Sequence, residues 1–245
     1  MKAVGIIPAR YHSTRLEGKP LMDIHGKPMI QWVYENVMKA DVLDEVFVAT
    51  DDQRIVEVVE RFGGRAMMTS RDHTTGTDRI AEVAKNLDVQ VVINIQGDEP
   101  FITPTMINEV ATPLLGDQDI PMCTLMHEIT EEDFHNPNVV KVVADSSGFA
   151  LYFSRSLIPY PRNKEGHQAF EHIGIYGYQK TFLLKLSTLP PTPLEKTEAL
   201  EQLRVLENGY KIKVISTAAK DYIPLSIDTK EDLERARAII RSLRA

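Results

Sequence analysis

The stretch MKAVGIIPARYHSTRLEGKPL, residues 1–21, decides the fold, because the rest of the chain is organised around it. Residues 3–7 predict a short buried strand, and the loop behind it carries three cations, Arg10, Arg15 and Lys19. A basic, glycine-containing loop after a strand is suited to a polyanion, above all a phosphate chain. The glycine spacing fits neither an NTPase phosphate loop nor a dinucleotide-binding turn, so side-chain clamps on phosphates are expected. A solvated basic loop is the alternative.

Composition places the chain among ordinary globular proteins. Its 245 residues suffice for one large α/β domain, and 43% hydrophobic with 26% charged residues is typical of a soluble protein. No apolar run approaches the ~20 residues of a membrane helix, and no charged-then-apolar leader opens the sequence, so a cytoplasmic protein without membrane insertion is expected. The net charge of −7 argues against nucleic-acid binding. The single cysteine, Cys123, excludes an internal disulfide.

Apolar strands and amphipathic helices alternate from residue 3 to about residue 115. Further strands are predicted at 45–50, 66–68 and 91–95, and apolar helical stripes at 29–37, 55–62, 80–87 and 107–114. Such alternation predicts an α/β fold with a mostly parallel, Rossmann-like sheet that helices cover on both faces.

The pattern changes after about residue 121. Residues 139–154 predict an antiparallel hairpin and 172–178 another strand, which together suggest a smaller α+β lobe for a second substrate or a dimer contact. One helix is predicted from a capping box at 192–195 to Gly209. A strand at 211–216 and a terminal helix from Asp228 complete the chain. We expect a single domain over 1–245, with a core of about 1–120 plus 211–245 and a smaller lobe of about 121–210.

Acidic side chains at the predicted strand ends are the first candidates for chemistry. Ligands of open parallel sheets bind beyond the carboxyl ends of the strands, where Arg10 and Asp98 would share one rim. A carboxylate acts on a triphosphate mainly through a hard cation such as Mg²⁺, which takes one or two carboxylates. Asp228, at the start of the last helix, is the second candidate. Turn formation and helix capping are the alternatives for these two aspartates.

Three further features are weaker. Residues 75–79 (TGTDR) open a helix, and their backbone N–H groups and hydroxyls suit a base or a phosphate. Helix capping by Thr77 is the alternative explanation for these residues. Arg155 and His172 are polar residues of the smaller lobe, and a structural role is the default for a histidine among apolar neighbours. The sequence shows no Ser-His-Asp order and no paired-histidine spacing, so a zinc site is not expected.

Several segments together resemble the sugar-acid cytidylyltransferases. The opening segments IPAR (7–10), TRL (14–16), GKPL (18–21) and GKPMI (26–30) carry the resemblance, as do VATD (48–51), GTDR (76–79) and QGDEP (96–100). More specific are YFSR (152–155), GIYGY (174–178) and EQLR (201–204), which match members acting on 3-deoxy-manno-octulosonate (Kdo). The resemblance covers essentially the whole chain.

The resemblance implies a nucleotidyltransferase fold and transfer of CMP from CTP to Kdo with release of pyrophosphate, which activates Kdo for lipopolysaccharide biosynthesis. It also implies Mg²⁺ as cofactor and a homodimer whose smaller lobe serves sugar binding and dimerisation. By matching position, Arg10, Arg15, Lys19 and Asp98 are the catalytic residues. Asp98 and Asp228 would hold Mg²⁺. The nucleotide would contact Ala9, Arg10, Thr75, Gly76 and Arg79. The sugar acid would contact Gln96, Arg155, His172, Tyr176, Glu201 and Gln202, with Arg155 offering a two-pronged fork for its carboxylate.

Some positions depart from the family pattern, and rival functions stay open. Glu17 stands where proline is common, Ser226 and Lys230 replace a frequent glycine and proline, and Thr75 replaces serine but keeps the hydroxyl. The nearest rivals are cytidylyltransferases for 8-amino-Kdo or sialic acid. A non-catalytic nucleotide-binding protein is the rival from a different class.

Overall fold

The computed structural model describes residues 1–12, 16–163 and 165–244. Arg15, one of the three cations of the expected phosphate clamp, lies outside these residues. Within them, nine strands form one sheet, whose main path runs β11-β7-β10-β6-β1-β4-β5. No helix in the described part of the chain is long and apolar enough to cross a bilayer.

The first half of the chain builds the parallel part of the sheet. β1 pairs in parallel with β4 and β6, and β4 pairs in parallel with β5. These strands alternate with helices, as the apolar pattern predicted. Their bounds are β1 Ala3–Ala9, α1 Met29–Val37, β4 Glu45–Thr50, α2 Gln53–Arg61, β5 Ala66–Met68, α3 Gly76–Lys85, β6 Val91–Asn94 and α4 Pro104–Gly116, with short pieces at η1 Lys19–Leu21, β2 Asp23–Ile24 and β3 Lys27–Pro28.

The second half adds antiparallel pairings to the sheet. β10 (Phe170–Gln179) is antiparallel to both β6 and β7 (Met122–Glu128), and β11 (Ile212–Ser216) is parallel to β7. The predicted hairpin is β8 (Lys141–Ala144) with β9 (Ala150–Ser154), and β8 also pairs with β10. The sheet is therefore mostly parallel, as predicted. The remaining helices are η2 Glu131–Asp133, α5 Lys180–Leu186, α6 Pro193–Glu198, α7 Leu203–Glu207 and α8 Lys230–Arg244.

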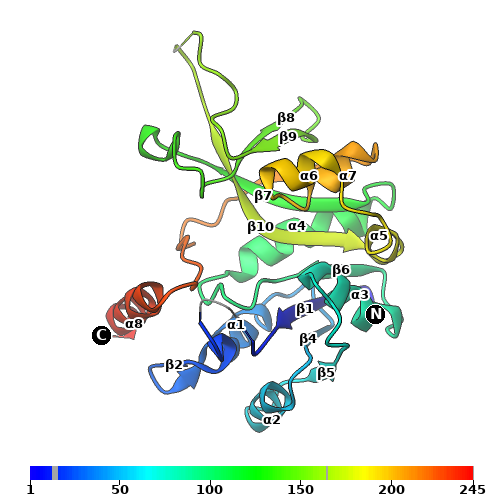
Figure 1. The fold of residues 1–245 in the computed structure, drawn as a ribbon, viewed down its shortest axis with the longest axis vertical. Coiled ribbons are helices and arrows are strands. Elements are labelled where there is room, and N and C mark those ends of the chain that lie inside the picture. Colours follow the sequence, from blue (N-terminus) through cyan, green and yellow to red (C-terminus); the bar gives the residue numbers. More distant parts are fainter. Residues whose placement is uncertain (13–15, 164, 245) are drawn as a thin grey trace.

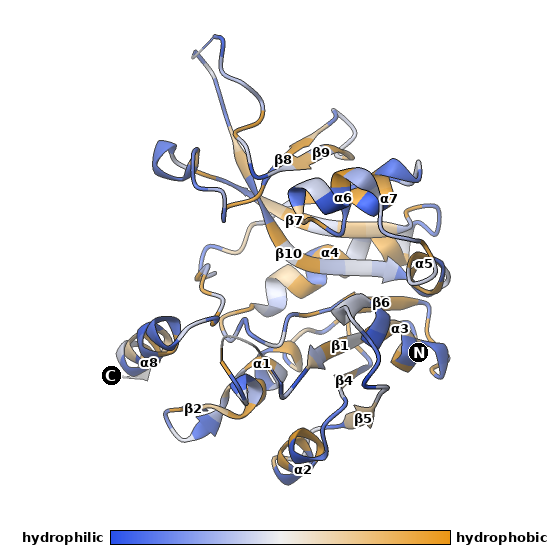
Figure 2. Cartoon of the chain, in the orientation of Figure 1, coloured by the Kyte–Doolittle hydropathy of each residue, from blue (hydrophilic) through white to orange (hydrophobic). Residues whose placement is uncertain are grey.

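Helices cover both faces of the sheet because both faces are apolar. Along β1, Ile7 packs with α1, α2 and α4, whereas Val4 and Ile6 pack with α3, α5 and α7. Successive strand residues point to opposite faces, so a strand buried on both sides must be apolar throughout. Figure 2 shows hydrophobic colour along β1 and β6 and mostly hydrophilic colour on α8.

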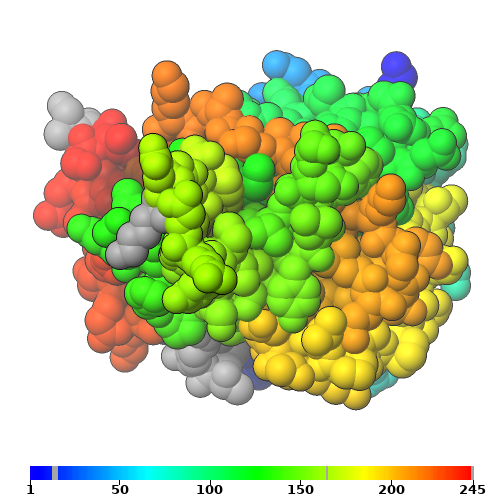
Figure 3. Space-filling view, turned by 90° about the horizontal axis from the view of Figure 1, so that it is seen from above, coloured from blue at the N-terminus to red at the C-terminus, as the bar shows by residue number. Residues whose placement is uncertain are grey.

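Most segments between β6 and β11 form the upper part of the molecule, whereas α8 lies beside the lower part (Figure 1). β8, β9, α6 and α7 lie beyond β10, on the side away from β1 (Figure 1). Seen from above, the surface consists mainly of green, yellow and orange segments, with red α8 at one side (Figure 3). The residue limits of a core and a smaller lobe stay a prediction.

One predicted helix is wrong. The stretch expected as a single helix from Thr192 to Gly209 is broken into α6 and α7 by Ala199, which adopts a left-handed backbone with φ of 52°. Left-handed conformations are costly for any residue with a Cβ, so alanine gives no sequence signal of such a break. The break matters for the site, because Glu201 and Gln202 lie in the turn that it creates.

Candidate active site

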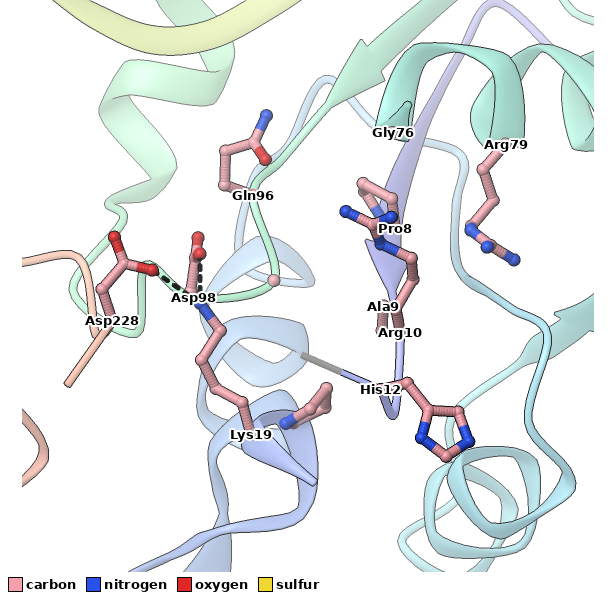
Figure 4. A pocket seen from close by; sticks show the side chains of 12 residues that line it. Pro8, Ala9, Arg10, His12, Lys19, Gly76, Arg79, Gln96, Asp98 and Asp228 are labelled. Atoms are coloured by element: carbon pink, nitrogen blue, oxygen red, sulfur yellow. Dashed lines mark hydrogen bonds and ion pairs between the residues drawn. The ribbon is translucent and has the colours of Figure 1, made fainter. Parts of the chain in front are cut away.

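The carboxyl ends of β1 and β6 meet at a cavity of about 340 Å³. The two strands run parallel, so their following loops lie at the same edge of the sheet, where ligands of such folds bind. The cavity volume is within the range of small-molecule sites. Figure 4 shows its lining, which includes Pro8, Ala9, Arg10, Lys19, Gly76, Arg79, Gln96, Gly97, Asp98 and Asp228.

Gly97 fixes the path of the loop after β6. A Cβ at this position would lie 2.8 Å from the backbone oxygen of Pro8, closer than such atoms approach in real proteins. Glycine therefore lets the loop pass directly over the end of β1, which places Gln96 and Asp98 on the rim. The backbone oxygen of Asp98 accepts a hydrogen bond of 2.9 Å from the N–H of Ile227, and this bond holds the segment of Asp228 against the same loop.

Asp98 and Asp228 converge on a single cation. The Lys19 Nζ lies 2.6 Å from Asp98 Oδ2 and 3.1 Å from Asp228 Oδ1, although these aspartates are 130 positions apart in sequence (228 − 98). Figure 4 shows the ammonium reaching both carboxylates. No group of three or more potential metal-binding side chains occurs within the residues that the structure describes. The arrangement thus offers two protein carboxylates to a cation and leaves its other ligands to come from elsewhere.

The basic loop after β1 places Arg10 and Lys19 on the lining of the cavity. Gly18 adopts a left-handed backbone with φ of 68°, and its N–H donates to the backbone oxygen of Tyr11 at 2.8 Å. The chain therefore turns back before η1 begins with Lys19. Arg10 is exposed and lines the cavity. Glu17, the unexpected acid of this loop, points outward and pairs with exposed His12 at 3.6 Å.

The start of α3 forms the opposite wall. Thr75 caps this helix, since its Oγ1 accepts from the N–H of Asp78 at 3.1 Å, so the expectation that Thr77 is the cap is wrong. Gly76 lines the cavity, and a Cβ there would be in ordinary contact with Pro8. Arg79 is only 1% exposed. Its guanidinium donates to Asp51 at 3.0 Å and to Thr69, so it ties α3 to the ends of β4 and β5 beside the cavity.

Thr77 instead links α3 to the turn after Ala199. Its hydroxyl donates to Glu201 Oε2 at 2.5 Å, across 124 positions of sequence. Burial raises the pKa of Glu201, against the opposing effect of the Thr77 hydrogen bond. Glu201 Oε1 and Gln202 Nε2 are buried and have no hydrogen-bond partner in the described part of the chain, although Arg204 Nη2 lies 3.8 Å from Glu201 Oε1. Buried polar atoms normally find partners, so these two are suited to a polar ligand.

His172 and Tyr176 lie on β10 within a row of aromatic rings. The His172 ring is 5.0 Å from Phe153 and 5.3 Å from Tyr176 between centroids. Burial lowers the pKa of His172 to about 3 and raises that of Tyr176 well above its usual range, so both side chains are neutral at physiological pH. The His172 Nε2 lies 3.0 Å from Thr124 Oγ1.

Arg155 is held by backbone oxygens. Its guanidinium donates to Glu198 at 2.7 Å, Pro137 at 2.8 Å and Ala199 at 3.4 Å. Three of its five N–H groups are used in this way, which anchors the fork beside the turn of Glu201. It does not line the cavity of Asp98. Its predicted bond to a substrate carboxylate stays a prediction.

Comparison with known proteins decides the family. A family model described as cytidylyltransferase matches residues 4–212. The chain belongs to the cytidylyltransferase family.

Close relatives of this cytidylyltransferase span its full length. It is 54% identical over 247 aligned residues to the 3-deoxy-manno-octulosonate cytidylyltransferase of Geotalea uraniireducens, covering 96% of this chain and 97% of the relative. It is 53% identical to the enzyme of the same name from Fusobacterium nucleatum, with 96% and 95% covered. A solved structure of CMP-2-keto-3-deoxy-manno-octonic acid synthetase complexed with CTP superposes with a TM-score of 0.94 at 45% identity, with 99% of both chains covered. A Leptospira borgpetersenii cytidylyltransferase at 19% identity and a TM-score of 0.64 shares the fold.

The structure brings most of the sequence-predicted residues of this cytidylyltransferase into two adjoining groups. One surrounds Asp98, and the other includes Tyr176 and Glu201. Sequence reasoning missed Thr124 and Arg204 as supports of the second group. Arg204 pairs with Glu195 at 2.5 Å and lies within the EQLR segment, which could have drawn attention to it. Thr124 is one threonine in an apolar strand, and its sequence context carries no signal of a site.

Proposed function

We propose that this chain transfers CMP from CTP to the anomeric hydroxyl of Kdo, giving CMP-Kdo and pyrophosphate. The observation that carries the proposal is the full-length likeness, at 45% identity, to a synthetase of this kind complexed with CTP. Activation of Kdo for lipopolysaccharide biosynthesis follows as the proposed role, and the cytoplasm as the proposed location.

The nucleotide binds in the cavity between β1 and α3 in this proposal. The side chains of Arg10 and Lys19 face the triphosphate, and Arg15 joins them from outside the described residues. The base lies near Ala9 and the N-terminus of α3, with Gly76 leaving room for close approach. Positive side chains at the end of a parallel strand suit a polyphosphate, and this geometry supports the assignment.

We propose Mg²⁺ as the divalent cation, held by Asp98 and Asp228. The two carboxylates fit this ion because they already converge on one ammonium, and Mg²⁺ usually takes one or two carboxylates and completes its shell with phosphate oxygens and water. When bound, the ion would neutralise charge on the phosphates and lower the pKa of the attacking hydroxyl. Lys19 then serves as a second positive charge at the same rim.

The sugar acid occupies the neighbouring group of polar side chains. Gln96 stands between the two groups, while His172, Tyr176, Glu201 and Gln202 face the hydroxyls. The buried atoms Glu201 Oε1 and Gln202 Nε2 have no hydrogen bond within the described residues, and this supports the placement. Arg155 supplies positive charge near the carboxylate of the sugar acid.

The proposed reaction is an in-line attack by the anomeric oxygen on the α-phosphorus of CTP, without a covalent enzyme intermediate. A bond forms between the sugar oxygen and phosphorus, and the hydroxyl proton is released to solvent. The bond from phosphorus to the bridging oxygen of pyrophosphate breaks, and its electron pair leaves with pyrophosphate. The residues of the chain hold the two substrates in line and balance the negative charge, which is the main contribution of proteins to phosphoryl transfer.

A homodimer is also proposed. Large apolar side chains are exposed in the second half of the chain, Leu151 on β9 at 62% and Tyr160 beyond it at 83%, and such side chains suit a protein contact. Molar mass by light scattering after size-exclusion chromatography tests this point, with twice the chain mass expected and the chain mass contradicting it.

Pyrophosphate release tests the proposed activity. The enzyme is given CTP with freshly prepared Kdo, 8-amino-Kdo or sialic acid, each with Mg²⁺ and with chelator. Pyrophosphate release is expected only in the reaction that contains CTP, Kdo and Mg²⁺. Release only with 8-amino-Kdo or sialic acid would favour the rival substrates, and CTP binding with no release for any sugar acid would favour a non-catalytic binding protein.

A further inference from the structure

A bulge in β10 creates an unusual polar contact beneath the proposed sugar site. Ile173 pairs with Leu125 of β7, but the next pair along is Tyr176 with Thr124. One step along β7 therefore corresponds to three along β10, and Gly174 with Ile175 lies outside the regular ladder. Bulges of this kind leave backbone groups without their ladder partners.

The Thr124 hydroxyl lies within hydrogen-bond distance of two backbone oxygens at this bulge. Thr124 is fully buried, and its Oγ1 lies 2.7 Å from the backbone oxygen of Ile175 and 3.1 Å from that of Ile173. Carbonyl oxygens only accept hydrogen bonds, and a hydroxyl has a single proton to donate. The hydroxyl proton of Thr124 therefore points to these backbone oxygens, and the oxygen of Ile175 is the nearer of the two.

This use of the proton determines how His172 bonds to Thr124. The His172 Nε2 lies 3.0 Å from the same Oγ1, whose only proton is already engaged. Hence Nε2 must carry a hydrogen and donate it to the hydroxyl oxygen. Burial keeps the ring neutral, as the lowered pKa indicates, so Nδ1 has no hydrogen and is an acceptor.

His172 lies beside Tyr176, one of the side chains assigned to the sugar acid, with 5.3 Å between their ring centroids. Within the residues that the structure describes, none hydrogen-bonds to Nδ1. His172 as a whole residue is 9% exposed, and its ring is next to those of Phe153 and Tyr176. An acceptor in such a confined place favours a ligand that presents a hydroxyl hydrogen over one that does not.

We infer that Thr124 is a positioning residue that sets the tautomer of His172, so that Nδ1 accepts a hydrogen bond from a hydroxyl of the sugar acid. The inference about the hydroxyl rests on the proposed function, whereas the tautomer itself does not. Thr124 thereby contributes to substrate specificity without touching the substrate.

Nitrogen NMR of the ligand-free enzyme tests the tautomer. The protein is labelled with ¹⁵N-histidine, and the His172 signals are assigned by their loss in His172→Gln. In the wild type and in Thr124→Ser, which keeps the hydroxyl, Nε2 is expected to carry the hydrogen. In Thr124→Val, which has the same shape without the hydroxyl, that preference is expected to weaken or reverse. A hydrogen on Nδ1 in the wild type overturns the inference, even if the valine variant does not fold.

Kinetics test the consequence for substrate binding. Thr124→Val is expected to raise KM for Kdo by about tenfold to a hundredfold, the range for losing one buried hydrogen bond, with KM for CTP unchanged. Thr124→Ser is expected to restore the wild-type value. Equal rises in both KM values, or no restoration by serine, would assign Thr124 a merely structural role. If Kdo is not a substrate, the proposed function fails while the NMR result still decides the tautomer.

Discussion

Replacing Lys19 by methionine is predicted to have opposite effects on metal binding and on catalysis. Lys19 Nζ occupies the point where the Asp98 and Asp228 carboxylates converge, at 2.6 Å and 3.1 Å. A divalent cation held by the same carboxylates must displace this ammonium. Methionine has a similar length and no charge, so Lys19→Met removes the competitor and leaves both carboxylates in place.

The size of the effect follows from the two ion pairs. The side chains are 15% exposed for Lys19, 26% for Asp98 and 35% for Asp228, so solvent screens both pairs in part. Pairs of this kind contribute about 0.5–1 kcal/mol each, or about 1–2 kcal/mol together. Because ~1.4 kcal/mol is a factor of ten, the nucleotide-free variant is expected to bind a divalent cation about five- to thirtyfold more tightly. Its rate of pyrophosphate release should nevertheless fall, because a cation facing the triphosphate is lost.

Mn²⁺ is a suitable probe, since the free ion can be followed by electron paramagnetic resonance. Wild type and Lys19→Met are titrated without nucleotide. The matched control is Lys27→Met, because Lys27 forms an ion pair of 2.6 Å with Glu35 away from the cavity. The control should leave Mn²⁺ affinity unchanged. Equal or weaker binding by Lys19→Met would refute the claim that this ammonium occupies the cation position.

Three further substitutions test other parts of the site. Thr77→Val should lower kcat/KM for the sugar acid by about tenfold to a hundredfold, because the hydrogen bond to Glu201 is lost. Thr77→Ser should retain the activity, and unchanged kinetics in the valine variant would contradict this prediction. Glu195→Gln should lower stability by about 3 kcal/mol at pH 7, because buried Arg204 loses its carboxylate partner at 2.5 Å and retains the more distant Glu201 at 3.8 Å; calorimetry should show a lower Tm. Burial raises the pKa of Glu195, but the hydrogen bonds from Arg204 outweigh burial, so the pKa in the folded protein is lowered. The stabilisation is therefore present above the unfolded pKa of 4.5 and is lost as pH falls through the folded pKa. A stability difference between Glu195→Gln and the wild type that persists at pH 2 would contradict the assignment. Gly97→Ala should reduce activity at least about tenfold by forcing the loop off the end of β1, and wild-type turnover would show that the close approach is dispensable.

The parts of the fold that depend on local pattern were predictable from the sequence. Both faces of β1 are buried, so its apolar run indicated a central strand of a parallel sheet. The rule that ligands bind at the carboxyl ends of strands then selected Arg10 and Asp98, and the structure places both on one cavity. A family resemblance supplied the expected roles of the proposed sugar-site residues, which composition and spacing could not give.

The missed features depend on contacts between distant parts of the chain. Ala199 breaks the expected helix in a backbone conformation that alanine rarely adopts, so tertiary contacts such as those of Arg155 with its neighbouring oxygens outweigh the local preference. The bond from Thr77 to Glu201 spans 124 positions, and each residue alone fits an ordinary helix start or turn. The bulge that engages Thr124 likewise exists only once β7 and β10 are paired.

The product formed from CTP and Kdo is the most direct test of the proposed activity. The reaction is followed by ³¹P NMR with Mg²⁺ and a stoichiometric amount of enzyme. One phosphodiester signal of CMP-Kdo and one equivalent of pyrophosphate are expected for each CTP consumed. Free CMP without the phosphodiester, or CTP left intact while sialic acid or 8-amino-Kdo reacts, would contradict it.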